Sequence, residues 1–280
     1  MSAIHALEPA YSMAAFAVGV LVGLTGVGGG SVMTPILILL FGIYPATAVG
    51  TDLLHAAVTK TAGSLVHGRN RTIEWRVVRR LATGSIPTTI VTIAALSAID
   101  INGPLARDLI NAVLAVALVI TAATLVFRNR IVARYSPGFA ALADRRIAAI
   151  TVAVGAVIGA IVSISSVGAG AIGVTALVLL YPKLPAARIV GSDIAHAVPL
   201  TLAAGIGHWF LGSIDFAVFT SLILGSVPGI LLGSYAAVRI PERALRLVLA
   251  VALLAVATKL SFGLVSPPAD VVAVKTSTPR

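Results

Sequence analysis

Two Asp–His pairs are the residues of this chain with the clearest capacity for chemistry. Asp52 and His55 lie three positions apart in an apolar stretch, and Asp193 and His196 repeat that spacing further along. Residues three apart share a face of a helix, so each pair would present a carboxylate beside an imidazole. An Asp near the centre of a membrane helix costs roughly 2.5 to 3.5 kcal/mol on insertion scales, which makes it a functional candidate. We expect both pairs to act in proton coupling or gating, with structural support of a site as the alternative.

Two glycine-rich interruptions could bind an anion. Gly28-Gly29-Gly30-Ser31 and Gly168-Ala169-Gly170-Ala171 each precede a short apolar stretch. A helix that begins inside a membrane exposes unpaired N–H groups and the positive end of its dipole. Close helix packing is the alternative use of such small residues. We expect substrate to be bound by the breaks and by hydroxyls near them: Thr25, Gly28, Gly29, Gly30, Ser31, Thr51, Ser166, Gly168, Gly170 and Ser192.

The composition indicates a membrane protein. Hydrophobic residues make up 58% of the 280 residues and charged residues only 11%, whereas about a quarter of a soluble domain is charged. A soluble enzyme is therefore excluded. The absence of cysteine excludes disulfides, iron–sulfur ligation and thiolate metal sites, and we expect neither a cofactor nor a bound metal.

Ten apolar stretches divide the chain. Six of them are about 19 residues or longer, enough for a helix to cross the hydrocarbon core. The stretches from Ser31 and Ala171 are too short and are expected to be half-helices that follow a break. Whether residues 10–42 and 147–182 form re-entrant hairpins or full crossings stays open. The stretches are 10–27, 31–42, 45–66, 77–98, 105–127, 147–164, 171–182, 186–208, 217–238 and 247–265.

The chain matches itself at an offset of 141 residues. Residues 50–55 (GTDLLH) fall on 191–196 (GSDIAH), and 84–87 (GSIP) fall on 225–228 (GSVP). Lys60 has no basic counterpart, since Thr201 takes its place, and we include Lys60 among the gating residues as a possible anion attractor. The predicted organisation is a first membrane repeat over 10–127, a basic linker over 128–146, a second repeat over 147–265 and a disordered tail over 266–280.

The basic residues predict how the repeats are oriented. Fifteen of the 20 Lys and Arg residues fall on one side if the linker is cytoplasmic and both termini are outside, as expected from the preference of basic loops for the cytoplasm. This arrangement makes the two copies inverted, as in many secondary transporters. The predicted fold is thus all-α and polytopic, built from two inverted repeats with broken or re-entrant half-helices. The net charge of +10 then reflects topology, and we expect no nucleic-acid partner.

The paired motifs resemble a known family. Residues 26–31 (GVGGGS) followed by Pro35, then residues 48–51 (AVGT), then His67 before a basic loop, are similar to the TauE/SafE sulfite exporter (TSUP) family. The second copy is similar through Val190-Gly191-Ser192 and Gly207-His208. The resemblance covers roughly residues 10–262 and implies a bacterial inner-membrane permease that exports sulfite, sulfonates or related sulfur oxyanions. Asp52 and Asp193 stand where the family more often has Ser after Gly-Thr, which leaves the exact substrate open.

The expected function is alternating-access transport of such an anion, with or without proton coupling. Three alternatives remain. A cation or metal carrier would use Asp52, His55, Asp193 and His196, although the missing Cys and only three Met disfavour soft metals. A passive anion channel is the second. An intramembrane enzyme is the third, and the usual serine-hydrolase and zinc-protease motifs are absent from the sequence. The expected partners are the anion and membrane lipid, with a homodimer as one option for assembly.

Overall fold

The computed structural model describes residues 9–25, 30–236 and 242–265, and every element assigned within them is a helix. The chain is therefore an all-α protein. Glycine-rich or proline-containing turns separate most of the helices. Proline lacks the N–H that a helix interior needs but is favourable at a first helical position, and a proline is the first residue of α3 and of α5. The helices are α1 (Pro9–Thr25), α2 (Gly30–Leu39), α3 (Pro45–Arg69), α4 (Trp75–Ser97), α5 (Pro104–Ala140), α6 (Asp144–Ser165), α7 (Ala171–Leu180), α8 (Ala186–Phe210), α9 (Phe216–Ala236) and α10 (Glu242–Val265).

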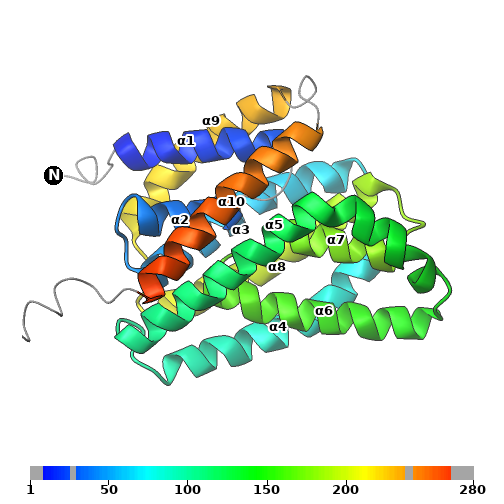
Figure 1. Cartoon of the computed structure of the whole chain (residues 1–280), viewed down its shortest axis with the longest axis horizontal. Coiled ribbons are helices and arrows are strands. Elements are labelled where there is room, and N and C mark those ends of the chain that lie inside the picture. Colours follow the sequence, from blue (N-terminus) through cyan, green and yellow to red (C-terminus); the bar gives the residue numbers. More distant parts are fainter. Residues whose placement is uncertain (1–8, 26–29, 237–241, 266–280) are drawn as a thin grey trace, which may run out of the picture.

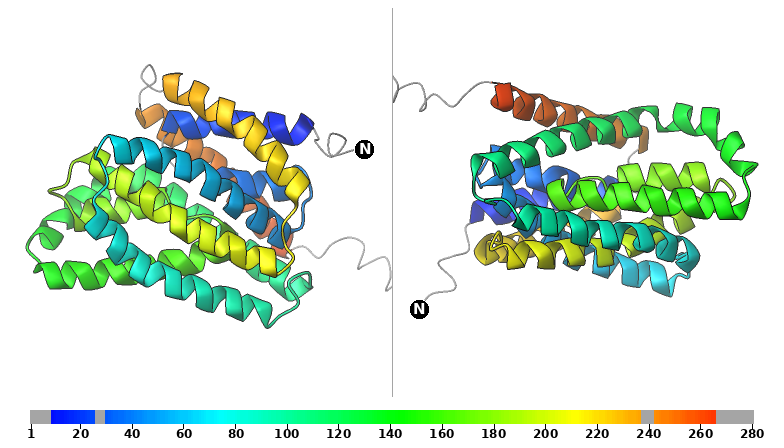
Figure 2. Two further views of the ribbon diagram at one scale, coloured as in Figure 1. Left: turned by 180° about the vertical axis from the view of Figure 1, so that it is seen from behind. Right: turned by 90° about the horizontal axis from the view of Figure 1, so that it is seen from below.

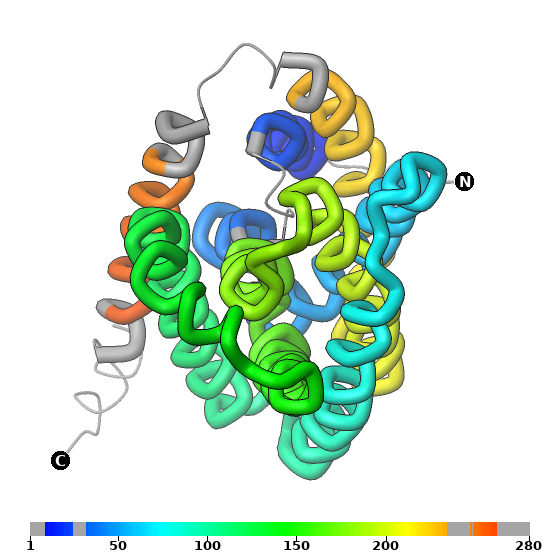
Figure 3. Tube along the Cα trace, turned by 90° about the vertical axis from the view of Figure 1, so that its right-hand side faces the viewer, coloured from blue at the N-terminus to red at the C-terminus, as the bar shows by residue number. Residues whose placement is uncertain are grey.

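Three helix pairs give the molecule its layers. Helix α1 packs on α9 along one side, and α4 packs on α6 along the opposite side (Figure 1). Helices α3 and α8 pack against each other between these two pairs, as the view from behind shows (Figure 2, left). Most helices follow the long axis of the molecule and are seen end-on in Figure 3, as expected of a bundle that crosses a bilayer.

Four helices are long and apolar enough to span a membrane by length and composition, among the described residues. They are Pro104–Ala140, Asp144–Ser165, Ala186–Phe210 and the Phe216–Gly233 part of α9. Large apolar side chains such as Leu231 and Ile90 are exposed on the outer helices, as expected of a surface that faces lipid. The protein is accordingly a multi-pass membrane protein.

The two short helices that the sequence predicts are present. Helices α2 and α7 each contain 10 residues and so reach about 15 Å, half of a hydrocarbon core of about 30 Å. Helix α5 is longer than predicted, since its 37 residues include 128–140 of the expected linker. The predicted tail, 266–280, lies outside the described residues.

Equivalent parts of the two repeats make equivalent contacts. The Ser192 hydroxyl near the start of α8 accepts a hydrogen bond from the Glu74 amide, 2.8 Å, just beyond the end of α3. The Thr51 hydroxyl near the start of α3 accepts one from the Asp215 amide, 3.0 Å, just beyond the end of α8. Each helix therefore begins where the other ends, so α3 and α8 run antiparallel. Opposite directions of matched helices support the inverted arrangement, which we retain as a proposal.

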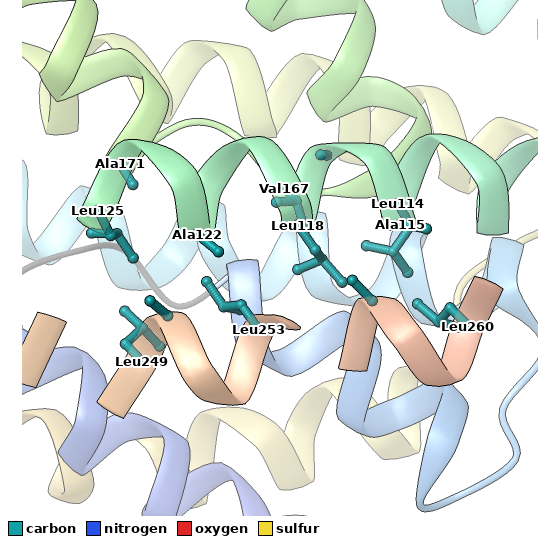
Figure 4. Packing of buried hydrophobic residues seen from close by; sticks show 13 residues of the cluster. Leu114, Ala115, Leu118, Ala122, Leu125, Val167, Ala171, Leu249, Leu253 and Leu260 are labelled. Atoms are coloured by element: carbon teal, nitrogen blue, oxygen red, sulfur yellow. The ribbon is translucent and has the colours of Figure 1, made fainter. Parts of the chain in front are cut away.

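Small residues let the paired helices approach closely. A Cβ atom on Gly84 would collide with the Val152 carbonyl oxygen of α6, and one on Gly225 would collide with the Ser12 carbonyl oxygen of α1. The α4–α6 and α1–α9 contacts are thus backbone to backbone. Membrane helices associate through such close van der Waals packing, because the hydrophobic effect does not drive helices together in lipid. By contrast, larger side chains fill the contact between α5 and α10, where Leu114, Leu118 and Leu253 interdigitate (Figure 4).

Candidate functional site

The break between α6 and α7 lies at the centre of the bundle. Helix α6 ends at Ser165, Ser166 adopts a left-handed conformation with φ of 59°, and α7 starts at Ala171. Gly168 has φ of +120°, which side chains rarely tolerate, so a glycine is needed at this point. The break expected over 168–170 is therefore present. In the first repeat, Gly28 and Gly29 lie outside the described residues, while α1 ends at Thr25 and α2 starts at Gly30, before Ser31.

Two residues of α3 hold this break in place. The Lys60 ammonium donates a hydrogen bond to the Ala169 carbonyl oxygen, 2.9 Å. The Ser166 hydroxyl donates to Oδ2 of Asp52, 2.9 Å. A carbonyl that faces an ammonium and a hydroxyl that faces a carboxylate are charge-assisted contacts, the stronger kind of hydrogen bond. The position of the break is thus coupled to α3.

Asp52 is enclosed by hydrogen-bond donors. Its carboxylate is fully buried and accepts a second bond, 2.6 Å, from the Thr34 hydroxyl of α2. His55 Nδ1 lies 3.4 Å from its Oδ1. Burial of a charge is tolerated when such partners are present. Asp52 therefore connects α3 to both α2 and the α6–α7 break.

Each of the two central histidines is bound to a serine of the facing helix. His55 Nε2 lies 2.8 Å from the Ser226 hydroxyl of α9, and His196 Nε2 lies 2.8 Å from the Ser85 hydroxyl of α4. The four residues match at the 141-residue offset. The repeat therefore reproduces an actual side-chain contact, in addition to a sequence pattern.

A cavity of about 250 Å³ adjoins the break. It is below the roughly 300 to 1,000 Å³ of pockets for drug-sized ligands, which suits a small solute. His55, Lys60, Asp193 and Ser226 line it, and it extends to His67 at the end of α3. Its remaining lining residues are mostly apolar or glycine: Val18, Gly19, Val22, Gly23, Thr59, Gly63, Ala169, Gly170, Val174, Val190, Ile194 and Ile230.

The structure brings only part of the expected site to this cavity. His55, Lys60, Asp193 and Gly170 line it, whereas Asp52 and His196 are buried away from its lining. Asp193 is 3% exposed, and its carboxylate packs so closely on Gly173 of α7 that a Cβ atom there would collide with Oδ1. Within the described ranges, no three His, Asp or Glu side chains are grouped as metal ligands.

Two of the expected substrate hydroxyls have other partners. Thr51 and Ser192 bind the backbone amides of Asp215 and Glu74 at the turns described above, and neither lines the cavity. Ser192 also donates to the Arg188 carbonyl oxygen, 2.6 Å. Their role in substrate binding stays a prediction. The side chains of Thr25 and Ser31 lie outside what the structure describes.

The serines that hold the histidines were not among the predicted site residues. Ser85 and Ser226 occur in the repeated Gly-Ser-x-Pro motif, so the repeat itself contained the signal. Thr59 and Gly63, which also line the cavity, were missed too, although they lie four positions apart on α3 and Gly63 lies three positions from Lys60. That spacing could have placed them on the same face.

Comparison with known proteins agrees with this architecture. The profile of the "Sulfite exporter TauE/SafE" family matches residues 11–260. The chain belongs to this family. Among its relatives, the "Probable membrane transporter protein YjnA" of Bacillus subtilis (strain 168) is 38% identical over 87% of this chain and 95% of its own length.

A second Bacillus subtilis (strain 168) relative, the "Probable membrane transporter protein YdhB", is 24% identical over 78% of this chain and 86% of its own length. A third, the "Probable membrane transporter protein YunE", is 38% identical over a shorter segment, 25% of this chain. No solved structure matches. The family and these relatives identify a membrane transporter of the TauE/SafE type.

Proposed function

We propose that this protein is a secondary transporter that moves a small sulfur-containing anion, such as sulfite or an organosulfonate, out through the bacterial inner membrane. The observation that carries the proposal is Lys60, a residue only 9% exposed, which lines a small cavity at the α6–α7 break. An ammonium in low dielectric attracts an anion far more strongly than one in water. The family name supplies the substrate class, since "sulfite exporter" describes that family.

The neighbours of Lys60 suggest how binding is controlled. Its hydrogen bond to the Ala169 carbonyl leaves the ammonium with further donors, which are available to an anion entering the cavity. Asp193 lines the same cavity as Lys60. A carboxylate there competes with an anionic substrate, and its protonation removes that competition. We therefore assign Asp193 to proton coupling and His55 to gating.

Flux into and out of proteoliposomes tests this function. Purified protein is tested with sulfite, an alkylsulfonate, thiosulfate and sulfate, with and without a pH gradient. We expect saturable flux of at least one sulfur anion, accelerated by counterflow and altered by the gradient. Non-saturable flux without counterflow would indicate a passive channel, and flux of a divalent cation instead of any anion would favour the metal-carrier alternative.

A further inference from the structure

The cavity is open in only one of the two equivalent halves. Toward the end of α3, the partly exposed residues that line it are Val22, Gly23, Thr59, Gly63 and His67. Helices α1 and α6 correspond at an offset of 140 residues, because Gly19 packs on the Ser226 backbone as Gly159 packs on the Ser85 backbone, whereas α3 and α8 correspond at 141. The counterparts in the second repeat are all 0% exposed: Val162, Ser163, Leu200, Ala204 and His208. Equivalent positions therefore line a cavity in one half and are fully buried in the other.

Apolar packing closes the second half. Val162 of α6 and Leu200 and Ala204 of α8 belong to one buried cluster with Val49 and Leu53 of α3. A close-packed contact of this kind excludes water and solute. It occupies the place that corresponds to the open cavity.

Hydrogen bonds add a polar seal at the same end. His208 Nε2 lies 2.9 Å from the Ser163 carbonyl oxygen, and the Ser163 hydroxyl donates to Oγ1 of Thr89, 3.1 Å. This set ties α8, α6 and α4 together where an opening would form. In the open half, Gly23 and Ile230 stand at the positions of Ser163 and Thr89, so the side-chain part of the seal is specific to the closed half.

The His67 ring is held in the same way as the His208 ring, which contacts the Ser163 carbonyl oxygen. Its Nδ1 lies 2.8 Å from the Thr72 hydroxyl, just as His208 Nδ1 lies 2.9 Å from the Ser213 hydroxyl. Both rings are therefore held by the turn that follows their helix. The carbonyl that corresponds to Ser163 is that of Gly23, and Gly23 and His67 line the same open cavity. The Gly23 carbonyl oxygen is therefore the acceptor for His67 Nε2 that corresponds to the Ser163 carbonyl oxygen for His208.

We propose that the protein has a second access state in which a pathway opens at the other end of the bundle, between α4, α6 and α8, while His67 closes on Gly23. Thr89, Ser163, Ala204 and His208 line this pathway. The inference rests on the proposed transport function. Asp52, His196 and Ser85 lie at its base as Asp193, His55 and Ser226 lie at the base of the present cavity, which gives both Asp–His pairs a use.

Matched cysteine variants test the second pathway, and the absence of native cysteine leaves no background. Gly63→Cys and Ala204→Cys occupy equivalent positions, and each is treated with a membrane-impermeant thiol reagent from either side of proteoliposomes. We expect Gly63→Cys to react from the side of the α3–α4 turn and Ala204→Cys from the opposite side. Val116→Cys, at a residue 59% exposed on the outside of α5, serves as a lipid-facing control that reacts from neither.

A variant that weakens the seal supplies a second measurement. Thr89→Val removes the acceptor for Ser163 with little change in volume, and in the Ala204→Cys background it should speed labelling about fivefold, the factor that corresponds to a hydrogen bond of about 1 kcal/mol. Ile230→Val, at the equivalent position of the open half, should not speed it. Ala204→Cys protein that transports but never reacts, with or without Thr89→Val, would overturn the second pathway. Absent flux with normal labelling would instead refute the proposed function alone.

Discussion

Lys60 is the residue with the sharpest expected effect on transport. Lys60→Met keeps the length and most of the apolar volume of the side chain but removes its charge. We expect the apparent KM for the transported anion to rise on the order of tenfold, because a hydrogen bond to a charged group contributes about 1.5 to 3 kcal/mol and 1.4 kcal/mol is a factor of ten. Initial-rate flux over a range of substrate concentrations measures it.

Lys259 provides the matched control for that substitution. It also lies in a helix, α10, but is exposed and is not part of the cavity lining. Lys259→Met should leave KM unchanged. An equal loss in both variants would mean that Lys60 contributes only general charge or stability, and it would remove Lys60 from the binding site.

Thr34 is expected to matter for stability, since its hydroxyl is one of two that donate to the buried Asp52 carboxylate. Thr34→Val leaves a buried charge with one donor fewer, at a cost of about 1 to 3 kcal/mol. Thermal unfolding in detergent should show a lower Tm. Thr258→Val is the control, because Thr258 is exposed and its hydroxyl donates only to the Leu254 carbonyl of its own helix. A Tm unchanged by Thr34→Val would show that the Thr34–Asp52 hydrogen bond contributes nothing measurable to stability.

For single residues, the sequence predicted which residues lie near the centre of the protein better than it predicted their hydrogen-bond partners. Of the four residues in the Asp–His pairs, His55 and Asp193 line the cavity, while the role of both pairs in proton coupling or gating stays a prediction. It did not predict that Thr51 and Ser192 bind turn amides, because the partner amides are more than a hundred residues away and become neighbours only when α3 and α8 pack antiparallel. An amide at the end of a helix needs an acceptor, and these hydroxyls supply it.

Between elements, the glycines of α4 and α9 control how closely helices pack. Gly84→Ala and Gly225→Ala place a methyl group against a carbonyl oxygen of the neighbouring helix, and overpacking of this kind costs about 1 to 3 kcal/mol. Both variants should unfold at lower temperature in detergent, by similar amounts if the two contacts are equivalent.

A third glycine gives the opposite expectation. Nothing lies within 4 Å of a Cβ atom on Gly138 in the last turns of α5, so Gly138→Ala should be neutral or stabilise by about 0.5 to 1 kcal/mol through helix propensity. A loss of stability in Gly138→Ala equal to that in Gly84→Ala would show that the effect is not one of packing.

The helices themselves follow from the apolar stretches, but their ends do not. Helix α5 illustrates the reason: the apolar part of its sequence stops near Phe127, yet the helix continues to Ala140. Arg128, Arg130 and Arg134 are favourable residues for a helix in water. A change from apolar to basic residues therefore marks where a helix leaves the bilayer, and it does not mark where the helix ends.

On the scale of the whole molecule, the proposed inversion makes a direct prediction about sidedness. Asn70 and Asn102 are exposed residues in the turns after α3 and after α4. As single cysteines, Asn70→Cys should react with an impermeant thiol reagent only from the cytoplasm and Asn102→Cys only from outside. Intact cells and inverted vesicles give the two measurements. Reaction of both from the same side would contradict the topology inferred from the basic residues.

One difference between the halves has a kinetic consequence. Lys60 borders the present cavity, and its counterpart Thr201 is neutral, so the two entrances of the proposed carrier differ in charge. An asymmetric carrier cannot alter the final distribution of an uncoupled solute, because the ratio of maximal velocity to half-saturation must then be the same in both directions. On the side where Lys60 borders the entrance, the half-saturating concentration of the anion is lower. The maximal velocity from that side is then lower by the same factor. With the expected orientation this is the cytoplasmic face, which suits a protein that must clear a solute while it is still dilute.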